Sequence, residues 1–206
     1  TNEFLGGDVH KLVSLHLGSG ASLCAIQDGK CMDTTMGLTP LDGLIMGTRC
    51  GTLDPATVFF LSREGGYSID EIDTMMNKQS GMLAVSGVSS DSRDIEAGAE
   101  NGDENCKMAL EMFYYRTAQL TSEMVCSMEG VDTLVFTAGI GENSAEMRQG
   151  VADRLAWLGV QIDPELNAIR SGEPRVISTP DSKIRVLVVP TNEELMIALD
   201  VEALLG

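Results

Sequence analysis

The chain of 206 residues is poor in basic and aromatic side chains and has no long apolar run. Lys and Arg total 14 against 31 Asp and Glu, which gives a formal net charge of −17 and an isoelectric point near 4.3. Nucleic acids and anionic membranes are bound through basic surfaces, so we expect neither as a partner. No apolar run reaches the roughly 20 residues that span a bilayer, and the chain does not open with a signal-peptide pattern.

The cysteines form no recognisable framework. They are five in number, show no CxxC spacing and are not accompanied by paired histidines. An odd number in this arrangement suggests neither a disulfide scaffold nor a zinc site, so we expect a cytoplasmic, reducing environment. The five are Cys24, Cys31, Cys50, Cys106 and Cys126.

Two familiar nucleotide-binding motifs are also missing. The sequence contains no GxxxxGK[ST], which excludes a P-loop. Gly139-Ile140-Gly141 lacks the third glycine of GxGxxG and does not follow a first strand, so a Rossmann dinucleotide site is rejected.

The apolar and glycine patterns predict one α/β body. A three-stranded meander is expected over residues 11–17, 21–26 and 30–34, and further strands over 131–137 and 184–189. Helices are expected at 54–62, after a capping box at Ser68, and at 93–99, 103–128, 144–158 and 192–205. We expect Thr191 and Glu194 to cap the last of these, and residues 80–91 to form a loop.

Methionines recur at roughly helical spacing in the 103–128 helix, which predicts a buried stripe and not a cofactor site. The stripe consists of Met108, Met112, Tyr115, Leu120 and Met124.

Residues 33–55 (DTTMGLTPLDGLIMGTRCGTLDP) are rich in glycine and contain a single base, Arg49. Glycines allow backbone N–H groups to approach a ligand closely, and a guanidinium binds phosphate or carboxylate. The alternative is a long connection whose glycines only serve tight turns. The segment therefore indicates an anion site without proving one.

Other glycine turns are expected where strands end. His16 precedes the Gly18-Ser19-Gly20 turn, and residues 139–143 follow a buried strand, although a plain hairpin explains the first equally well. Glu193 follows the last strand and is the better candidate for an ion, because Glu194 has a capping role. Together these groups suit phosphoryl transfer, which depends on positioning and charge neutralisation.

Five segments of the chain closely resemble the acetate kinase (acetokinase) family, in the family's order. They are HLGSGAS, the whole 33–55 run, SGVSSDSRDI, FTAGIGENSAEMR and VPTNEELMIA. The resemblance implies a ribonuclease-H-like α/β fold of the acetate and sugar kinase and actin superfamily, with a mixed sheet flanked by helices. It also implies ATP or ADP and Mg²⁺ as cofactors, and acetate or acetyl phosphate as the reacting partner.

The resemblance implies a role for each matching residue. Arg49 and His16 would be catalytic, with His16 and Gly18, Ser19 and Gly20 at the phosphates. Asp91, Ser92 and Arg93 would contact the adenosine, as would Gly139, Ile140, Gly141, Glu142 and Asn143. Pro40 would form a wall of the acyl pocket, and Glu193 would hold magnesium through water.

Only about half of a full family chain is represented, so residues 1–206 are expected to be its C-terminal nucleotide-binding domain without the N-terminal one. By itself this half is expected to bind nucleotide weakly and to be inactive, and the resemblance implies a homodimer. Three residues depart from the family's usual choice: Ser19 for Asn, Thr35 for Ser and Cys50 for Ser. The alternatives are a propionate kinase of the same family, or a non-catalytic nucleotide-binding or dimerisation domain.

Overall fold

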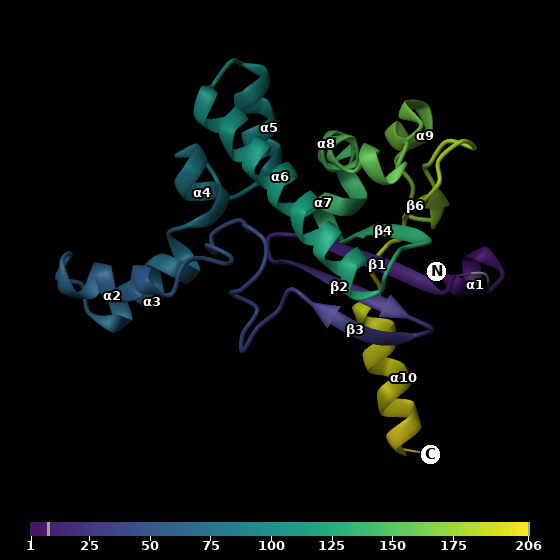
Figure 1. Cartoon of the computed structure of the whole chain (residues 1–206), viewed down its shortest axis with the longest axis horizontal. Helices are drawn as coiled ribbons and strands as arrows, with labels where there is room; N and C mark the ends of the chain where they lie inside the picture. The colour runs from purple at the N-terminus through teal and green to yellow at the C-terminus, as the bar shows by residue number, and fades with distance from the viewer. Residues whose placement is uncertain (8, 206) are drawn as a thin grey trace.

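The computed structural model describes residues 1–7 and 9–205, which form a six-stranded sheet with helices packed against it (Figure 1). The strands are β1 (Lys11–Leu17), β2 (Ala21–Gln27), β3 (Lys30–Thr34), β4 (Thr133–Thr137), β5 (Arg175–Val176) and β6 (Arg185–Val188). Their order in the sheet is β3-β2-β1-β4-β6-β5. β1, β2 and β3 form an antiparallel meander, whereas β1, β4 and β6 run parallel. The expected mixed α/β sheet is confirmed.

The three parallel strands end at one edge of the sheet. β1 ends at Leu17, β4 at Thr137 and β6 at Val188, and the registers Leu15↔Phe136 and Phe136↔Val188 align these ends. Ligands of open α/β sheets bind beyond the carboxyl ends of such strands. The segments that leave the three strands are therefore the place to look for a site.

Some helices pack against the sheet, and others extend away from it. They are α1 (Asn2–Leu5), α2 (Ala56–Arg63), α3 (Ile69–Lys78), α4 (Gly81–Ser86), α5 (Ser92–Glu100), α6 (Glu104–Ser127), α7 (Ala138–Asn143), α8 (Ala145–Arg154), the 3₁₀ turn η1 (Ala156–Leu158), α9 (Pro164–Ala168) and α10 (Glu193–Leu205). In Figure 1, α2 and α3 form a pair away from the sheet, and α10 extends away from it on another side. None of these helices, within the part of the chain that is described, has the length and apolarity needed to cross a membrane.

The core lies between the sheet and α6. Val13, Leu15 and Leu17 of β1 and Leu23 of β2 are completely buried, while the residues between them are less buried. Alternate residues of a strand point to opposite faces, so this pattern turns one face of the meander toward α6. Each such side chain contributes roughly 2 kcal/mol when it leaves water.

The expected methionine stripe on α6 is wrong at three of its five positions. Met108, Met112 and Tyr115 are 58%, 42% and 61% exposed, whereas Leu120 and Met124 are buried. The buried face of α6 instead carries Cys106, Ala109, Leu110, Phe113, Tyr114, Thr117, Ala118, Leu120, Thr121, Met124 and Val125. Thr121 is tolerated there because its hydroxyl donates to the Thr117 carbonyl one turn earlier, at 2.7 Å, so hydropathy alone selected the wrong face.

Two local predictions near the carboxyl edge are also wrong. Residues 80–91 are not all loop, because α4 occupies part of them. Residues 139–143 are not a glycine turn but lie inside α7, and the turn from strand to helix is made by Ala138 with φ +64°. The helix expected at 144–158 ends at Arg154 and is followed by η1.

Helix caps follow the sequence in one case and depart from it in another. Ser68 and Glu71 form the expected capping box at the start of α3. At α10 the Asn192 side chain accepts from the Leu195 N–H at 3.1 Å, so Asn192 is the cap and the expected role of Thr191 is wrong. The Thr191 hydroxyl is occupied by β4 and α7, as described below.

Candidate active site

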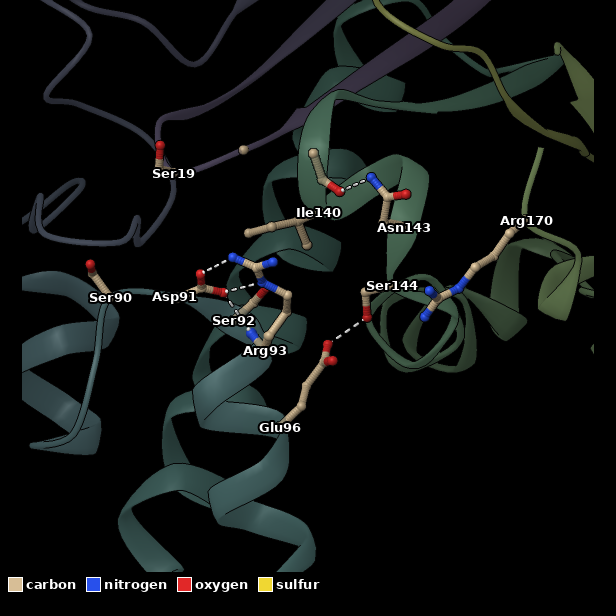
Figure 2. Close-up of a pocket in the computed structure, with 12 residues that line it drawn as sticks. Ser19, Ser90, Asp91, Ser92, Arg93, Glu96, Ile140, Asn143, Ser144 and Arg170 are labelled. Carbon is tan, nitrogen blue, oxygen red and sulfur yellow. Dashed lines mark hydrogen bonds and ion pairs between the residues drawn. The ribbon is translucent and has the colours of Figure 1, made fainter. Parts of the chain in front are cut away.

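Two cavities lie at the carboxyl edge of the sheet and share the β1–β2 turn. The larger, of about 640 Å³, is lined by Gly18, Ser19, Ser90, Asp91, Ser92, Arg93, Glu96, Gly139, Ile140, Asn143, Ser144 and Arg170 (Figure 2). The smaller, of about 300 Å³, is lined by His16, Gly18, Ser19, Gly20, Ala21, Ser22, Met36, Pro40 and Arg49. Because Gly18 and Ser19 line both, one extended ligand can occupy the two cavities across this turn.

The β1–β2 turn is closed by its own backbone. The Gly18 N–H donates to the Gly20 carbonyl at 3.0 Å. A Cβ atom on Gly20 would lie 3.0 Å from Arg49 Nη1, and one on Gly18 would lie 3.2 Å from the Gly20 oxygen. The two glycines are therefore needed for the tight turn and for the close approach of the guanidinium.

Arg49 lies against the turn and lines the smaller cavity. Nη1 donates to the Pro40 carbonyl at 3.2 Å and lies 3.7 Å from Met46 Sδ. These contacts hold one edge of the guanidinium, and within the described residues its other N–H groups have no hydrogen-bond acceptor. The side chain is thus preorganised next to His16 and Pro40 in a cavity that contains no neutralising carboxylate on its wall.

Helix α4 holds the backbone that presents Arg49. The N–H groups of Met82 and Leu83 donate to the carbonyls of Met46 and Gly47 at 2.8 and 2.9 Å. At the start of α4, Gly81 has φ +65°, and a Cβ atom there would lie 2.2 Å from the Met46 oxygen. This packing of helix on loop explains why residues 80–87 are not free loop.

Three segments of the chain meet at Gly47. Its N–H donates to the Ser19 carbonyl at 3.0 Å, and a Cβ atom on it would lie 3.2 Å from the Ser90 oxygen. The β1–β2 turn, the 33–55 segment and the segment before α5 are therefore fixed relative to one another by backbone contacts. The sequence predictions for these three segments are brought together at one place.

The first turn of α5 carries a charged pair on the wall of the larger cavity. Asp91 caps the helix by accepting from the Arg93 N–H at 2.9 Å, and its two oxygens also accept from Arg93 Nε at 3.0 Å and Nη2 at 2.5 Å (Figure 2). The bonds from Arg93 hold the pKa of Asp91 at about 2, well below its usual value. The Arg93 side chain is 85% exposed, so it is oriented by Asp91 while facing the cavity.

Glu96 and Ser144 connect α5 to the start of α8 across the same cavity. Ser144 Oγ donates to Glu96 Oε1 at 2.5 Å and also accepts from the Met147 N–H at 3.1 Å. Burial raises the pKa of Glu96, and the nearby carboxylates add to the rise. Figure 2 shows Arg170 reaching toward Ser144 from the opposite wall.

Helix α7 begins directly at the end of β4 and supplies another wall. Ala138 has φ +64°, and its N–H donates to Thr191 Oγ1 at 3.1 Å, while the Thr137 hydroxyl is 2.5 Å from the same oxygen. Within α7, Asn143 Nδ2 donates to the Gly139 carbonyl at 2.9 Å. The strained residue at the junction aims the first turn of α7 at the cavity.

Gly141 and Glu142 lie behind this wall and are not among the cavity's lining residues. A Cβ atom on Gly141 would lie 3.4 Å from the Phe136 backbone, and Glu142 Oε1 accepts from the Thr191 N–H at 2.9 Å. Both their carbonyls accept from Arg148. Gly141 and Glu142 therefore support α7. Their direct contact with a ligand stays a prediction.

Glu193 is the first residue of α10 and is exposed. The described residues contain no cluster of three or more His, Cys, Asp or Glu side chains able to hold a metal. Mg²⁺ often takes only one or two carboxylates and completes its shell with water and substrate phosphates, so a single carboxylate after β6 fits such an ion. The role of Glu193 stays a prediction.

Sequence reasoning missed four residues of the larger cavity, which are Ser90, Glu96, Ser144 and Arg170. Ser90 and Ser144 adjoin predicted residues, and Glu96 lies one helical turn after Ser92, so a helix starting at Ser92 would have pointed to it. Arg170 stands in an irregular segment with no neighbouring motif. Buried Arg148 ends the FTAGIGENSAEMR segment but was missed, because its partner Asn167 lies 19 residues further along the chain.

The architecture and the carboxyl-edge crevice are those of the ribonuclease-H-like fold of the acetate and sugar kinase and actin superfamily. The acetokinase family model matches residues 2–199. The chain belongs to the acetokinase family.

Relatives agree in name and in extent. The chain is 51% identical over 201 residues to an acetate kinase of Clostridium botulinum (strain Hall), which covers 97% of this chain and 50% of the relative. It is 50% identical over 200 residues to an acetate kinase of Clostridioides difficile (strain 630), covering 96% and 50%. The chain spans about half the length of the curated relatives it matches, and that half is a C-terminal portion.

Two solved structures match the fold closely. Porphyromonas gingivalis acetate kinase superposes with a TM-score of 0.93 at 42% identity, covering 100% of this chain and 52% of the other. A propionate kinase from Francisella tularensis superposes with a TM-score of 0.89 at 42% identity, covering 96% and 50%.

Proposed function

We propose that this chain is the nucleotide-binding half of an ATP:acetate phosphotransferase, which transfers the γ-phosphoryl group of ATP reversibly to acetate and yields acetyl phosphate and ADP. The observation that carries the proposal is the pair of cavities joined at Gly18 and Ser19, with Arg49 in the smaller one. A nucleoside in the larger cavity would extend its phosphates across the turn toward Arg49. The family and its acetate kinase members support this assignment.

The larger cavity suits a nucleoside. Its volume of about 640 Å³ lies in the range of ordinary small-molecule sites, and its wall offers both charged side chains and helix starts. Asp91, Ser92 and Arg93 at the start of α5 face Gly139, Ile140 and Asn143 of α7. We place the adenosine between these two helices and assign its contacts to both.

Arg49 would stabilise the phosphoryl group in flight. A guanidinium offers a rigid fork to oxygens that share negative charge, and here it is held next to His16 by the Pro40 carbonyl. His16 would donate a hydrogen bond to the same oxygens, and Pro40 would limit the space for the acyl methyl group. In-line transfer then needs little more than positioning of the two oxygens that exchange the phosphorus atom.

Mg²⁺ would neutralise phosphate charge, with Glu193 holding it through water. The described residues would not supply this neutralisation by themselves, because the walls of the smaller cavity contain a single guanidinium. The acceptor partner would be acetate in one direction and acetyl phosphate in the other.

The chain spans about half the length of its curated relatives, so the acceptor site is expected to be completed by the other half of the enzyme. We therefore propose that residues 1–206 by themselves bind nucleotide weakly and are inactive. Formation of acetyl hydroxamate from acetate, ATP and hydroxylamine by the isolated 206-residue chain would overturn this second proposal without affecting the family assignment.

The proposed function is tested by Arg49→Ala in the full-length protein that contains this chain. Loss of the guanidinium should lower kcat about 10³-fold, with little change in ATP affinity, because the fork acts mainly on the transition state. Arg49→Lys should not restore turnover, since an ammonium cannot supply the bidentate fork. The readouts are acetyl phosphate formation and ATP binding by calorimetry.

Arg63→Ala is the matched control, because Arg63 lies on α2 and stacks over Phe59 at 5.7 Å, away from both cavities. It should keep normal turnover. Turnover of Arg49→Ala within tenfold of the control would sink the catalytic role of Arg49.

Propionate transfer is the second candidate, because the Francisella tularensis structure is a propionate kinase that superposes as well as the Entamoeba histolytica acetate kinase does. The two functions differ in the space left for one methylene group near Pro40. Discrimination of one methylene amounts to about 1–3 kcal/mol, so kcat/KM on acetate and propionate should differ by 10-fold or more if the pocket is selective.

We also propose a homodimer in the cytoplasm. Exposed Met108, Met112 and Tyr115 form an apolar stripe on α6 that supports association, and all five cysteines are free thiols, which supports a reducing compartment. Light scattering of the purified protein at several concentrations tests the dimer.

A further inference from the structure

Two cysteines that line neither cavity are in contact on neighbouring strands. Cys24 Sγ and Cys31 Sγ are 3.2 Å apart, with Cys24 in the middle of β2 and Cys31 near the start of β3. Both are free thiols, Cys31 exposed and Cys24 half-buried. A disulfide places its sulfurs about 2.05 Å apart, so closure requires a movement of only about 1 Å.

The register of the hairpin explains the contact. Ile26 is the partner of Cys31, and the pairing shifts between Ala25 and Ile26 through a β-bulge. Cys24 lies two residues before Ile26 and therefore on the same face of β2, which makes it a diagonal neighbour of Cys31. A bulge increases the local twist and brings such diagonal side chains together.

We propose that Cys24 and Cys31 form a reversible intramolecular disulfide, which makes this hairpin a redox modification site for peroxides and for small disulfides such as oxidised glutathione. The reaction with hydrogen peroxide has two steps. The Cys31 thiol is first oxidised to a sulfenic acid, and the peroxide leaves as water. The Cys24 sulfur then bonds to the Cys31 sulfur and displaces the hydroxyl group, which takes the Cys24 proton and leaves as a second water. With oxidised glutathione, the Cys31 sulfur first forms a mixed disulfide and releases one glutathione as its thiol. The Cys24 sulfur then attacks Cys31 and releases the second glutathione as its thiol.

The order of these steps follows from exposure and charge. Burial raises the pKa of Cys24 to about 12, and the hydrogen bond with Cys31 and the charge of the Cys31 thiolate add to the rise. Cys24 therefore keeps its proton at neutral pH. Cys31 is the sulfur that solvent reaches, so an oxidant attacks it first. Cys24 is already in place as the resolving thiol. Disulfides of reducing compartments are usually transient and redox-sensing, which fits a bond that forms and opens here.

The bond would fix the hairpin that leads into the segment of Arg49. The other end of the hairpin is already held, because Thr34 Oγ1 donates to the Leu23 carbonyl at 2.9 Å and Thr35 Oγ1 accepts from the Leu23 N–H at 2.9 Å. Oxidation therefore adds a second constraint on the hairpin without moving the strands. The oxidised chain should unfold at a temperature about 5 °C higher than the reduced chain, since a short closed loop constrains the unfolded state.

The test uses the purified chain, reduced, desalted and then treated with hydrogen peroxide or oxidised glutathione. The intact mass should fall by about 2 Da. The thiol titre after denaturation should fall from five to three, the five free cysteines minus the pair. Peptide mapping should join Cys24 to Cys31, and a phosphine reductant should restore all thiols. These measurements are made on the unaltered sequence, so they do not depend on a variant folding.

Cys24→Ser and Cys31→Ser should each prevent the mass loss, whereas Cys126→Ser should still lose two thiols because Cys126 is exposed on α6 and takes no part in the pair. Retention of all five thiols under conditions that oxidise free glutathione would overturn the proposal. A stable glutathione adduct on Cys31 in place of the internal bond, or a bond mapped to Cys126, would overturn it equally.

Discussion

Replacement of the buried Arg148 by alanine is expected to destabilise the folded chain by about 4 kcal/mol. Arg148 lies on α8 and is 1% exposed. Its guanidinium donates four hydrogen bonds, to Asn167 Oδ1 at 2.7 Å, the Asn167 carbonyl at 2.6 Å, the Gly141 carbonyl at 2.9 Å and the Glu142 carbonyl at 3.0 Å. Alanine would remove the Arg148 donor from all four bonds, and within the described residues only the Glu142 carbonyl would keep a second donor, Arg175 Nη2 at 3.5 Å.

The magnitude is smaller than the sum of four bonds. A hydrogen bond to a charged group contributes about 1.5–3 kcal/mol, which would total about 8 kcal/mol. Against this stands the cost of burying the charge, which lowers the pKa of Arg148 to about 10 and is relieved when the side chain is removed. Breaking a buried charged cluster costs about 3–5 kcal/mol in practice, and we take the middle of that range.

The assay is thermal and denaturant unfolding followed by circular dichroism. A loss of about 4 kcal/mol corresponds to a fall in Tm of about 8–16 °C for a chain of this size. Arg148→Lys should cost about 2 kcal/mol of folding free energy, less than Arg148→Ala, because an ammonium keeps the charge but cannot reach all four acceptors.

Arg154→Ala is the charge-matched control on the same helix. Arg154 bonds the Gly150 carbonyl and pairs with Glu111, and its side chain is 29% exposed, so its removal should cost less than about 1 kcal/mol. If Arg148→Ala were within 1 kcal/mol of this control, the reasoning about buried acceptors would be wrong.

Three further changes are expected to have defined effects. Gly81→Ala should cost at least about 3 kcal/mol by denaturant unfolding, because its Cβ would meet the Met46 carbonyl at 2.2 Å, whereas Gly66→Ala, with a similar φ of +72° but open space, should cost about 1 kcal/mol. Equal losses would contradict the clash. Glu96→Gln should become increasingly more stable than wild type as pH rises above 4.5. In the wild type, the raised pKa of Glu96 in the folded chain contributes stability that is complete at low pH and is lost as pH rises through that pKa. A pH-independent difference would refute this. Asp91→Asn should weaken ATP binding in the full-length protein by releasing Arg93, and unchanged affinity by calorimetry would count against that role.

The motifs at the ends of strands could be identified from the sequence because they depend on short stretches of chain. The turn at Gly18 to Gly20, the single base Arg49 and the Asp91–Arg93 pair are each defined by residues close in sequence, and each lies on a cavity wall in the structure. The capping box at Ser68 is equally local and was correct.

Interactions between distant segments could not be read in the same way. Helix α4 (GMLAVS) is short and begins with glycine, and it forms because Met46 and Gly47 offer carbonyls to its first turn. The turn before α7 falls on Ala138 and not on the glycines, since Thr191, which comes 53 residues later, accepts from the Ala138 N–H. Neither partner is visible in a local pattern.

The sequence alone determined the family, through five matching segments, and the meander and the kinds of side chain at the site, because alternation and glycine turns act within a few residues. The tertiary structure alone decided which face of α6 is buried, why Arg170 joins the larger cavity and how Arg148 connects α7 to Asn167. These depend on packing between segments far apart in the chain, where the free energy comes from contacts that no single segment contains.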